Sequence, residues 1–340
     1  MLTKGLSQTG AHLIGAKIYL LNENLDIYVF DTRTLYWSKP ATFGVQPLPC
    51  VSFASALVGE KLYVFGGLRG DGQVSNDLYI FDTVHSAWAI EKEAKSEKSD
   101  QVAHQSSVSS PTWLPAVSSS SSSSSSSSFS SSSSLKQLKP SPRRGHTATV
   151  VGAKIYYFGG VTTESLVLDE LWSFDTETHA WAREAALCGQ PPSPRTYHAA
   201  VTAGKHIYVY GGTDGECVFG DLFRFEPPTN TWQQIFIPLP PSKRPGVFGH
   251  SLTLIGQWLL IFGGHDDQQH SSDLEIICLE TGNWQPVPVT GSTPSPRAHH
   301  QSIFLDNRLL IFGGANADTC YADVNQLDLS CYSWLPIIKS

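Results

Sequence analysis

Short apolar stretches separated by turn-forming residues run along most of this chain. Residues 62–65, 155–158 and 259–262 are typical, because each has four consecutive apolar side chains followed at once by Gly-Gly. Such short runs, rich in aromatic and β-branched residues and bounded by Gly, Pro, Asn or Asp, predict β-strands and turns. No helical period is sustained anywhere in the chain. We therefore expect an all-β protein.

The strands recur in a unit of about fifty residues. Each unit has an apolar strand, a strand ending in Gly-Gly, an acid followed by a third strand, and a Trp followed by a fourth. The closing residues are Trp37, Trp88, Trp181, Trp232, Trp284 and Trp334. A period near fifty predicts a radial array of four-stranded blades, because one blade cannot bury both faces of its sheet without its neighbours.

Two further features recur at fixed places in the unit. The glycine doublets are Gly66-Gly67, Gly159-Gly160, Gly211-Gly212, Gly263-Gly264 and Gly313-Gly314, and the first unit has Asn22-Glu23 instead. The acids, eleven residues before each Trp, are Asp26, Asp77, Glu170, Asp221, Asp273 and Asp323. We expect structural roles for all of them. Glycine permits positive φ and close approach at a strand end, the acids accept backbone hydrogen bonds, and the tryptophans pack between blades.

A Pro-Arg-x-x-His motif precedes several units. The histidines His146, His198, His250 and His300 lie thirteen residues before the first glycine, and Arg143, Arg195 and Arg297 lie three residues before three of them. These positions fall where the outer strand of one blade connects to the inner strand of the next, so we expect them at one mouth of the channel. The arginines either contact a ligand there or form hydrogen bonds between blades.

The combined pattern of Pro-Arg-x-x-His, Tyr-x-Phe-Gly-Gly, Asp-Leu-x-x-Phe-Asp and Trp resembles the kelch repeat. The resemblance implies a single kelch-type β-propeller over residues 1–340, with six four-stranded blades, or seven if the chain is a fragment. The expected blades span residues 5–40, 48–91, 142–185, 194–237, 246–289 and 296–338. We see no spare strand with which one end could complete the blade of the other, so we expect the ring either to close by packing alone or to need a further blade from a longer protein.

The same resemblance implies a partner site. In kelch propellers that bind peptides, arginines at the matching place often face the mouth and hold acidic groups. That makes Arg143, Arg195 and Arg297 candidates to bind a protein or peptide partner, which would then be acidic. Arg144 and Arg244 are weaker candidates. Units one, two and five lack the matching arginine, so the ring of positive charge is incomplete.

Residues 92–141, between the second and third units, depart from the repeat. They include a charged run at 92–100, the segment Trp113-Leu114, and serine tracts at 118–128 and 130–134. This composition buries too little apolar surface to offset chain entropy, so we expect a disordered low-complexity insert. Phosphorylated serines that dock on the arginines, or a short linear motif around Trp113, are the functional alternatives to a passive insert.

Composition narrows the function classes. The net charge of −7 with interspersed signs does not suggest a nucleic-acid surface, no apolar run is long enough to cross a membrane, and no signal peptide is evident at the start. The six cysteines have no metal-ligand spacing, and no catalytic motif is present. The run His265 to His270 is more typical of a solvated loop than of a metal site. We expect no cofactor.

The expected function is a non-catalytic protein-interaction module, an adaptor or scaffold in the cytoplasm or nucleus. Two alternatives stay open. One is a metal-dependent enzyme or specifier protein of the kelch type, which acids and histidines near the channel would serve. The other is an effector in trafficking or cytoskeletal regulation, which differs only in its partner.

Overall fold

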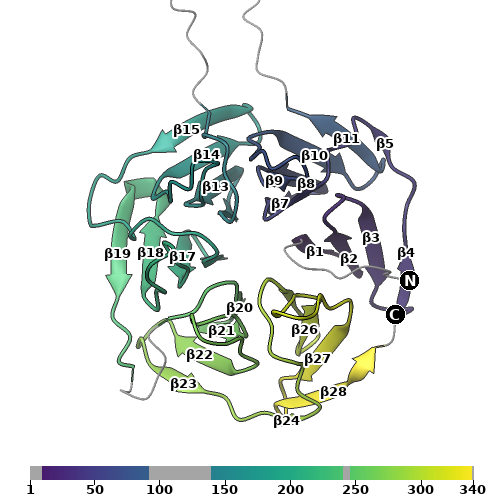
Figure 1. Ribbon diagram of the computed structural model, residues 1–340, viewed down its shortest axis with the longest axis vertical. Helices are drawn as coiled ribbons and strands as arrows, with labels where there is room; N and C mark the ends of the chain where they lie inside the picture. The colour runs from purple at the N-terminus through teal and green to yellow at the C-terminus, as the bar shows by residue number, and fades with distance from the viewer. Residues whose placement is uncertain (1–9, 92–138, 240–245, 339–340) are drawn as a thin grey trace, which may run out of the picture. The chain divides into compact units, whose positions relative to one another are not determined.

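A computed structural model describes residues 10–91, 139–239 and 246–338. These residues form a six-bladed β-propeller in which every blade is built around four consecutive antiparallel strands (Figure 1). Within them the only helical element is a single 3₁₀ turn, η1 (Pro227–Thr229). The expected six blades and the all-β class are thereby confirmed.

In each blade the four strands lie in sequence order, from the innermost strand at the channel to the outermost at the rim. Blades 1 to 3 consist of β1 (Gly10–Ile14), β2 (Lys17–Leu21), β3 (Ile27–Asp31) and β4 (Tyr36–Ser38); β7 (Ala54–Val58), β8 (Lys61–Phe65), β10 (Leu78–Asp82) and β11 (Ala87–Ile90); and β12 (Thr147–Val151), β13 (Lys154–Phe158), β14 (Leu171–Asp175) and β15 (Ala180–Glu184). Blades 4 to 6 consist of β16 (Ala199–Ala203), β17 (His206–Tyr210), β18 (Leu222–Glu226) and β19 (Thr231–Ile235); β20 (Ser251–Ile255), β21 (Trp258–Phe262), β22 (Leu274–Cys278) and β23 (Trp284–Pro286); and β25 (Gln301–Leu305), β26 (Arg308–Phe312), β27 (Val324–Asp328) and β28 (Ser333–Ile338).

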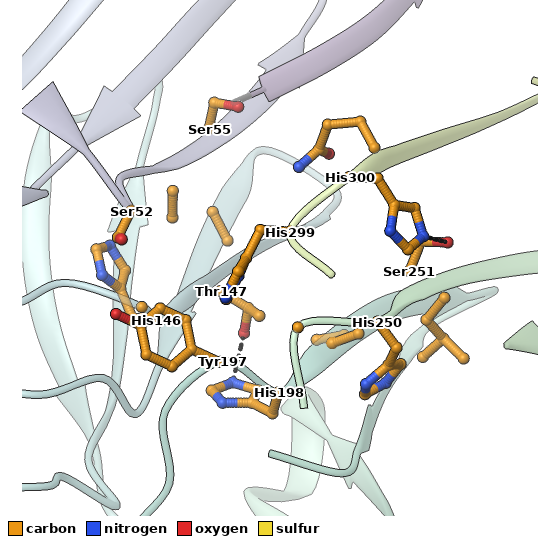
Figure 2. Close-up of a pocket in the computed structure, with 18 of the residues that line it drawn as sticks. Ser52, Ser55, His146, Thr147, Tyr197, His198, His250, Ser251, His299 and His300 are labelled. Carbon is orange, nitrogen blue, oxygen red and sulfur yellow. Dashed lines mark hydrogen bonds between the residues drawn. The ribbon is translucent and has the colours of Figure 1, made fainter. Parts of the chain in front are cut away.

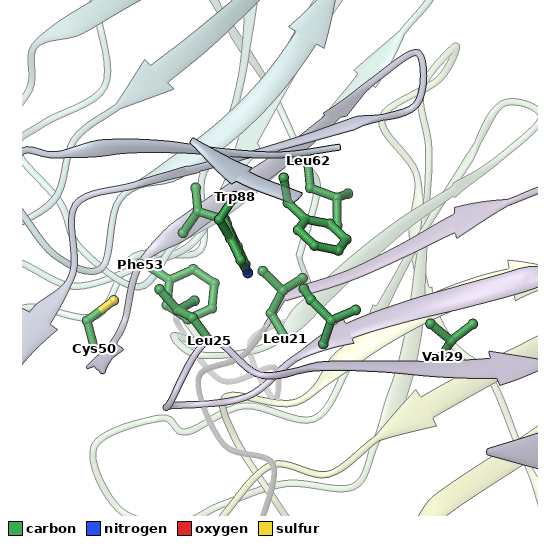
Figure 3. Close-up of a cluster of buried hydrophobic side chains, with 10 residues drawn as sticks. Leu21, Leu25, Val29, Cys50, Phe53, Leu62 and Trp88 are labelled. Carbon is green, nitrogen blue, oxygen red and sulfur yellow. The ribbon is translucent and has the colours of Figure 1, made fainter. Parts of the chain in front are cut away.

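The second strand of each blade is buried on both faces, which explains its continuous apolar run. Successive side chains of a strand point to opposite faces, and in β13 Ile155 and Tyr157 pack against blade 2 while Tyr156 and Phe158 pack against blade 4. Each blade interface therefore holds its own hydrophobic cluster. Figure 3 shows the one between blades 1 and 2, where Leu21 and Val29 share a cluster with Leu62 and Trp88.

The ring closes by the same kind of packing. Ile18, Leu20 and Phe30 of blade 1 form one cluster with Leu310 and Phe312 of blade 6. The four principal strands of these two blades come from one continuous stretch each, so closure requires no strand exchange between the ends.

Short segments of the connectors form a feature that the sequence analysis missed. β5 (Phe43–Gly44) pairs in parallel with β11, β24 (Thr290–Gly291) pairs in parallel with β28, and Cys188 forms a parallel bridge with Thr231 of β19. Each segment follows one blade and lies along the outer strand of the next. We call these three segments edge straps. They add short strands or bridges to the four strands that the sequence predicted for each blade.

A separate two-stranded sheet is formed in blade 2, where β6 (Cys50–Val51) pairs with β9 (Leu68–Arg69). The insert expected at residues 92–141 lies outside the described residues up to position 138. Residues 139–141 belong to the propeller instead, because the Pro140 carbonyl accepts a hydrogen bond from the Asn76 side chain at 3.1 Å. The Trp113 segment and the serine tracts lie outside the described residues.

Candidate functional site

The glycine doublets lie where backbone carbonyls and, in most blades, histidine side chains leave no room for a Cβ. A Cβ on Gly66 would lie 2.8 Å from the ring of His146 in the next blade, and a Cβ on Gly160 would lie 2.9 Å from the Cβ of His146 in its own blade. The ring of His146 packs edge-on against Phe65, with centroids 5.4 Å apart. His198, His250 and His300 make the same contact with Phe158, Tyr210 and Phe262 of the preceding blades.

The three arginines of the motif lie inside the blades. The side chains of Arg143, Arg195 and Arg297 are 0%, 0% and 1% exposed. The guanidinium of Arg195 donates two hydrogen bonds to the carboxylate of Asp221, at 2.6 and 3.1 Å, and further ones to the carbonyls of Gly211 and Ser193. Arg297 binds Asp323 in the same bidentate manner.

Arg143 differs in detail, since it donates to one oxygen of Glu170 at 2.7 Å while Arg183 binds the other oxygen at 3.0 Å. The burial of the three arginines argues against the expectation that they hold the acidic groups of a partner. It favours the alternative, a role in holding the blade together. The acids also differ from the expectation, because their main partners in these blades are arginine side chains and not backbone N–H groups.

Two units without the motif arginine supply another cation to the acid. In blade 2 the position holds Cys50, which pairs with Arg69 in the sheet register, and the guanidinium of Arg69 contacts Asp77. In blade 1 the ammonium of Lys39 lies 3.0 Å from Asp26. The pairing of acid and cation is therefore maintained from different sequence positions. Arg244, the weaker candidate of unit five, lies outside the described residues.

A chain of backbone hydrogen bonds runs around one mouth of the channel. It links the residues immediately before the inner-strand histidines, or before Phe53 in blade 2: Ser52, Gly145, Tyr197, Gly249 and His299, which we call the mouth residues. From Gly145 onward, each N–H donates to the carbonyl of the preceding blade's mouth residue, at 2.8, 2.8, 2.8 and 2.6 Å in turn. All five have positive φ. Since the backbone is fixed from both sides, their side chains project from a rigid frame.

The side chains at the mouth alternate between small and large. A Cβ on Gly145 would lie 3.1 Å from the Tyr197 ring, and a Cβ on Gly249 would lie 3.0 Å from the His299 ring. The absence of these two side chains lets the rings of Tyr197 and His299 meet across blade 5, with centroids 5.0 Å apart. Arg144 donates to the Tyr197 hydroxyl at 2.5 Å. The weaker arginine candidate thus belongs to the mouth, whereas the stronger ones do not.

Beneath these side chains lies a channel cavity of about 240 Å³, lined by the inner strands of all six blades. Its wall is polar and rich in imidazole (Figure 2). Three imidazoles bond to hydroxyls of a neighbouring blade: His12 to Ser55 at 2.8 Å, His198 to Thr147 at 2.9 Å, and His300 to Ser251 at 2.9 Å.

Desolvation keeps these imidazoles neutral. It lowers the pKa of His146 and of His300 to about 3, with a further contribution from the nearby Arg143 and Arg297 respectively. It lowers the pKa of His12 and of His299 to about 4. The channel wall therefore presents neutral hydrogen-bonding groups at physiological pH and not a ring of positive charge.

Two features bear on other chemistries. Within the described residues no three His, Cys, Asp or Glu side chains are grouped as metal ligands. In the loop from His265 to His270, the Asp266 carboxylate accepts backbone hydrogen bonds from Gln268 and Gln269, as expected of a turn residue. The parts of the chain that the structure describes contain no helix with the length and apolar character that a bilayer crossing requires.

Sequence reasoning did not single out Tyr197 and His299. The available signal was the residue directly before each recurring histidine, which reads Gly, Tyr, Gly, His over units three to six. That alternation of small and large residues is informative only once the four positions are known to be neighbours around one ring.

Comparison with known proteins agrees with this architecture. The family model of the KLHDC2/KLHL20/DRC7 Kelch-repeats domain matches residues 20–114, 122–257 and 237–339. Host cell factor of Drosophila melanogaster is 27% identical over 351 residues, which cover 90% of this chain and 20% of that protein. Kelch domain-containing protein 3 of Homo sapiens is 26% identical over 282 residues, covering 78% of this chain and 64% of that protein.

Acyl-CoA-binding domain-containing protein 4 of Arabidopsis thaliana is 24% identical over 320 residues, covering 92% of this chain and 42% of that protein. The chain thus spans less than two thirds of the length of each of these three relatives. The family model, by contrast, covers nearly the whole chain. The chain belongs to the family of kelch-repeat β-propellers.

Proposed function

We propose that this propeller is a non-catalytic protein-interaction module whose partner docks on the channel mouth over Arg144, Tyr197 and His299. The observation that carries the proposal is the contact of these three side chains on a frame of inter-blade hydrogen bonds. Tyrosine and arginine are the residue types that dominate protein interfaces. A fixed backbone reduces the ordering cost of binding.

The chemistry of the mouth favours a partner with an acidic group. Arg144 is half-buried, and its guanidinium donates to the neutral hydroxyl of Tyr197, while no carboxylate among the described residues forms an ion pair with it. The motif arginines are already paired with acids of their own blades. A carboxylate of the partner would therefore meet Arg144, while Tyr197 and His299 offer ring surface beside it.

A double substitution tests the proposal. Arg144→Ala with Tyr197→Gly removes the cation and the ring, and glycine is already present at the mouth positions 145 and 249 with the same sign of φ. The variant should therefore fold, which circular dichroism melting would check. In quantitative affinity capture from cell extract, we expect partners of the unmodified protein to be lost from the variant.

The control is Lys205→Ala, which removes an exposed cation from the turn between β16 and β17 that pairs with Glu226. It should retain every partner. An unchanged partner set for the folded double variant would overturn the proposal of a mouth site.

The enzyme alternative is distinguished by metal analysis of the purified protein. Stoichiometric iron or copper would favour a metal-dependent kelch-type enzyme. We propose the adaptor or scaffold role because the site offers binding groups, and because no Asp or Glu lines the described cavity to orient the hydroxyl–imidazole pairs for catalysis. Whether the partner belongs to trafficking or to the cytoskeleton is decided by its identity after capture.

A further inference from the structure

The edge straps seal the tryptophans of the blades on which they lie. In the three blades that have one, Trp88, Trp232 and Trp334 are 3%, 4% and 3% exposed. Trp37 of blade 1 and Trp181 of blade 3 have no strap among the described residues, and both are only half-buried, as is Trp284 of blade 5. The strap thus completes the outer edge of a blade.

Each edge strap places a glycine against the tryptophan backbone. A Cβ on Gly44, Gly189 or Gly291 would lie 2.1, 1.9 or 2.3 Å from the carbonyl oxygen of Trp88, Trp232 or Trp334. No other residue type fits so close an approach without a shift of the backbone. All three glycines have positive φ and stand ten residues before the first residue of the inner strand that follows.

The connector that leads to blade 3 cannot supply such a glycine. The sequence contains none from Lys92 to Arg144, and the position ten residues before β12 holds Gln137. For blade 1 the corresponding position precedes residue 1. Blades 3 and 5 are therefore the two blades whose own connectors lack a glycine at this position, which holds Gln137 and Pro241 respectively.

The edge of β15 presents the hydrogen-bonding groups that a strap would use. The Trp88 carbonyl accepts from the Val45 N–H at 2.9 Å, and the Trp232 N–H donates to the Cys188 carbonyl at 3.0 Å. Trp181 holds the same register opposite Phe174, so its N–H and C=O point away from β14. Among the described residues neither group has a backbone partner. The neighbouring Ala180 and Ala182 are exposed and small, which leaves access to the edge.

We infer that β15 is a docking edge for an extended segment of a partner protein, which adds to blade 3 as a parallel strand and places a glycine against the Trp181 carbonyl. This inference rests on the proposed interaction function and names a second surface for it. Such strand addition gives affinity through main-chain hydrogen bonds. The straps of this chain show the preferred sequence, since an exposed apolar residue precedes the glycine in Phe43-Gly44 and in Leu187-Cys188-Gly189.

A second copy of this chain does not fit the same role. Two β15 edges related by a two-fold axis would run antiparallel, and β15 itself contains no glycine. The glycine requirement therefore favours a different chain that carries an apolar–glycine segment.

The test uses a synthetic peptide with the sequence of residues 185–192, in which serine replaces Cys188 to prevent oxidation. Binding is followed by fluorescence polarisation and located by amide hydrogen exchange. We expect saturable binding and slower exchange of the Trp181 amide. Two matched peptides should bind roughly tenfold more weakly: one with alanine in place of glycine, and one N-methylated at the residue after glycine, which removes a single hydrogen-bond donor.

Three results would overturn the inference: no saturable binding, equal binding of all three peptides, or protection of Trp37 instead of Trp181. Sedimentation that shows β15-dependent self-association would overturn it too, in favour of a second copy. The Arg144→Ala/Tyr197→Gly variant should bind the peptide as the unmodified protein does. If the peptide does not bind while partners are still captured at the mouth, only the proposal of a β15 docking edge is refuted. The two proposals can therefore fail separately.

Discussion

At the scale of single residues, Arg195 shows how a charged side chain can belong to the interior of a blade. Its guanidinium donates to the Asp221 carboxylate and to two backbone carbonyls, and its plane lies over the ring of Phe219 at 4.4 Å from the centroid. Its own carbonyl accepts from the Gly160 N–H of the preceding blade at 2.9 Å. One residue thus links the loops at the ends of three strands, in two blades.

We predict that Arg195→Ala destabilises the propeller strongly. Removal of one member of a buried ion pair leaves the other without its counter-charge, which costs about 3 kcal/mol at the lower end of measured values. The lower end applies because the Asp221 side chain is 24% exposed. Urea unfolding measures the change. Arg224→Ala, at a half-buried position of β18 where the guanidinium donates to the neutral Gln233 side chain, should cost less, about 1 kcal/mol.

An Arg195→Ala protein of normal stability would return this arginine to the list of partner-binding candidates. The same substitution also separates stability from binding. If partners are lost from a variant that already melts early, the loss reports unfolding and carries no information about the mouth.

At the scale of elements, the edge straps show how two residues can complete a sheet. The peptide unit of Cys188 pairs with β19, and Gly189 lies against the Trp232 carbonyl with a φ of +76°. The strap adds few hydrogen bonds, but it covers the outer strand and the tryptophan beneath. Its geometry depends on a missing side chain more than on any side chain present.

Gly189→Ala is expected to disrupt the strap of blade 4. Gly204 provides the matched control, because it has a φ of +60° and no atom within 4 Å of an added Cβ. Gly204→Ala should cost only the strain of left-handed backbone, about 1–2 kcal/mol. Gly189→Ala carries that strain plus a clash, so we expect a larger loss of stability and greater acrylamide quenching of Trp232. Equal losses for the two variants would contradict the role of the strap.

The sequence predicted the elements that repeat and missed those that depend on neighbours. The Gly doublets, the six tryptophans and the four-strand unit are periodic, so the blades could be counted without a structure. The burial of Arg195 could not, because its acid follows 26 residues later and joins it only when the blade folds. The substitution of Arg69 for the arginine missing at Cys50 is visible only in the register of β6 and β9.

The sequence analysis missed the edge straps and the mouth residues for a similar reason. Phe43-Gly44 and Thr290-Gly291 are too short to show a strand pattern, and glycine has a low propensity for strands. Tyr197 and His299 lie 102 positions apart in the numbering and meet only across the ring. Periodic burial is a local signal, whereas these contacts are properties of the closed circle.

At the scale of the whole molecule, the circle of inner strands buries a set of imidazoles at its centre. Their pKa values are lowered by desolvation, to about 3 for His146 and His300 and to about 4 for His12 and His299. The ordinary value is 6.5. Folding therefore holds these groups neutral over a pH range in which the unfolded chain would protonate them. This free-energy cost of holding the imidazoles neutral appears only when all six blades close the channel and bury them.

The propeller should consequently lose stability as the pH falls below about 6.5. The unfolded chain binds more protons than the folded one between the two sets of pKa values, so the free energy of unfolding is largest above pH 6.5 and declines toward pH 4. Each imidazole contributes about 1.4 kcal/mol per pH unit well below its unfolded value. Urea unfolding at pH 7, 6 and 5 measures the slope, and His300→Gln should reduce it by about one proton. A stability that does not change between pH 7 and pH 5 would show that the channel histidines are solvated and that the central cavity is open to water.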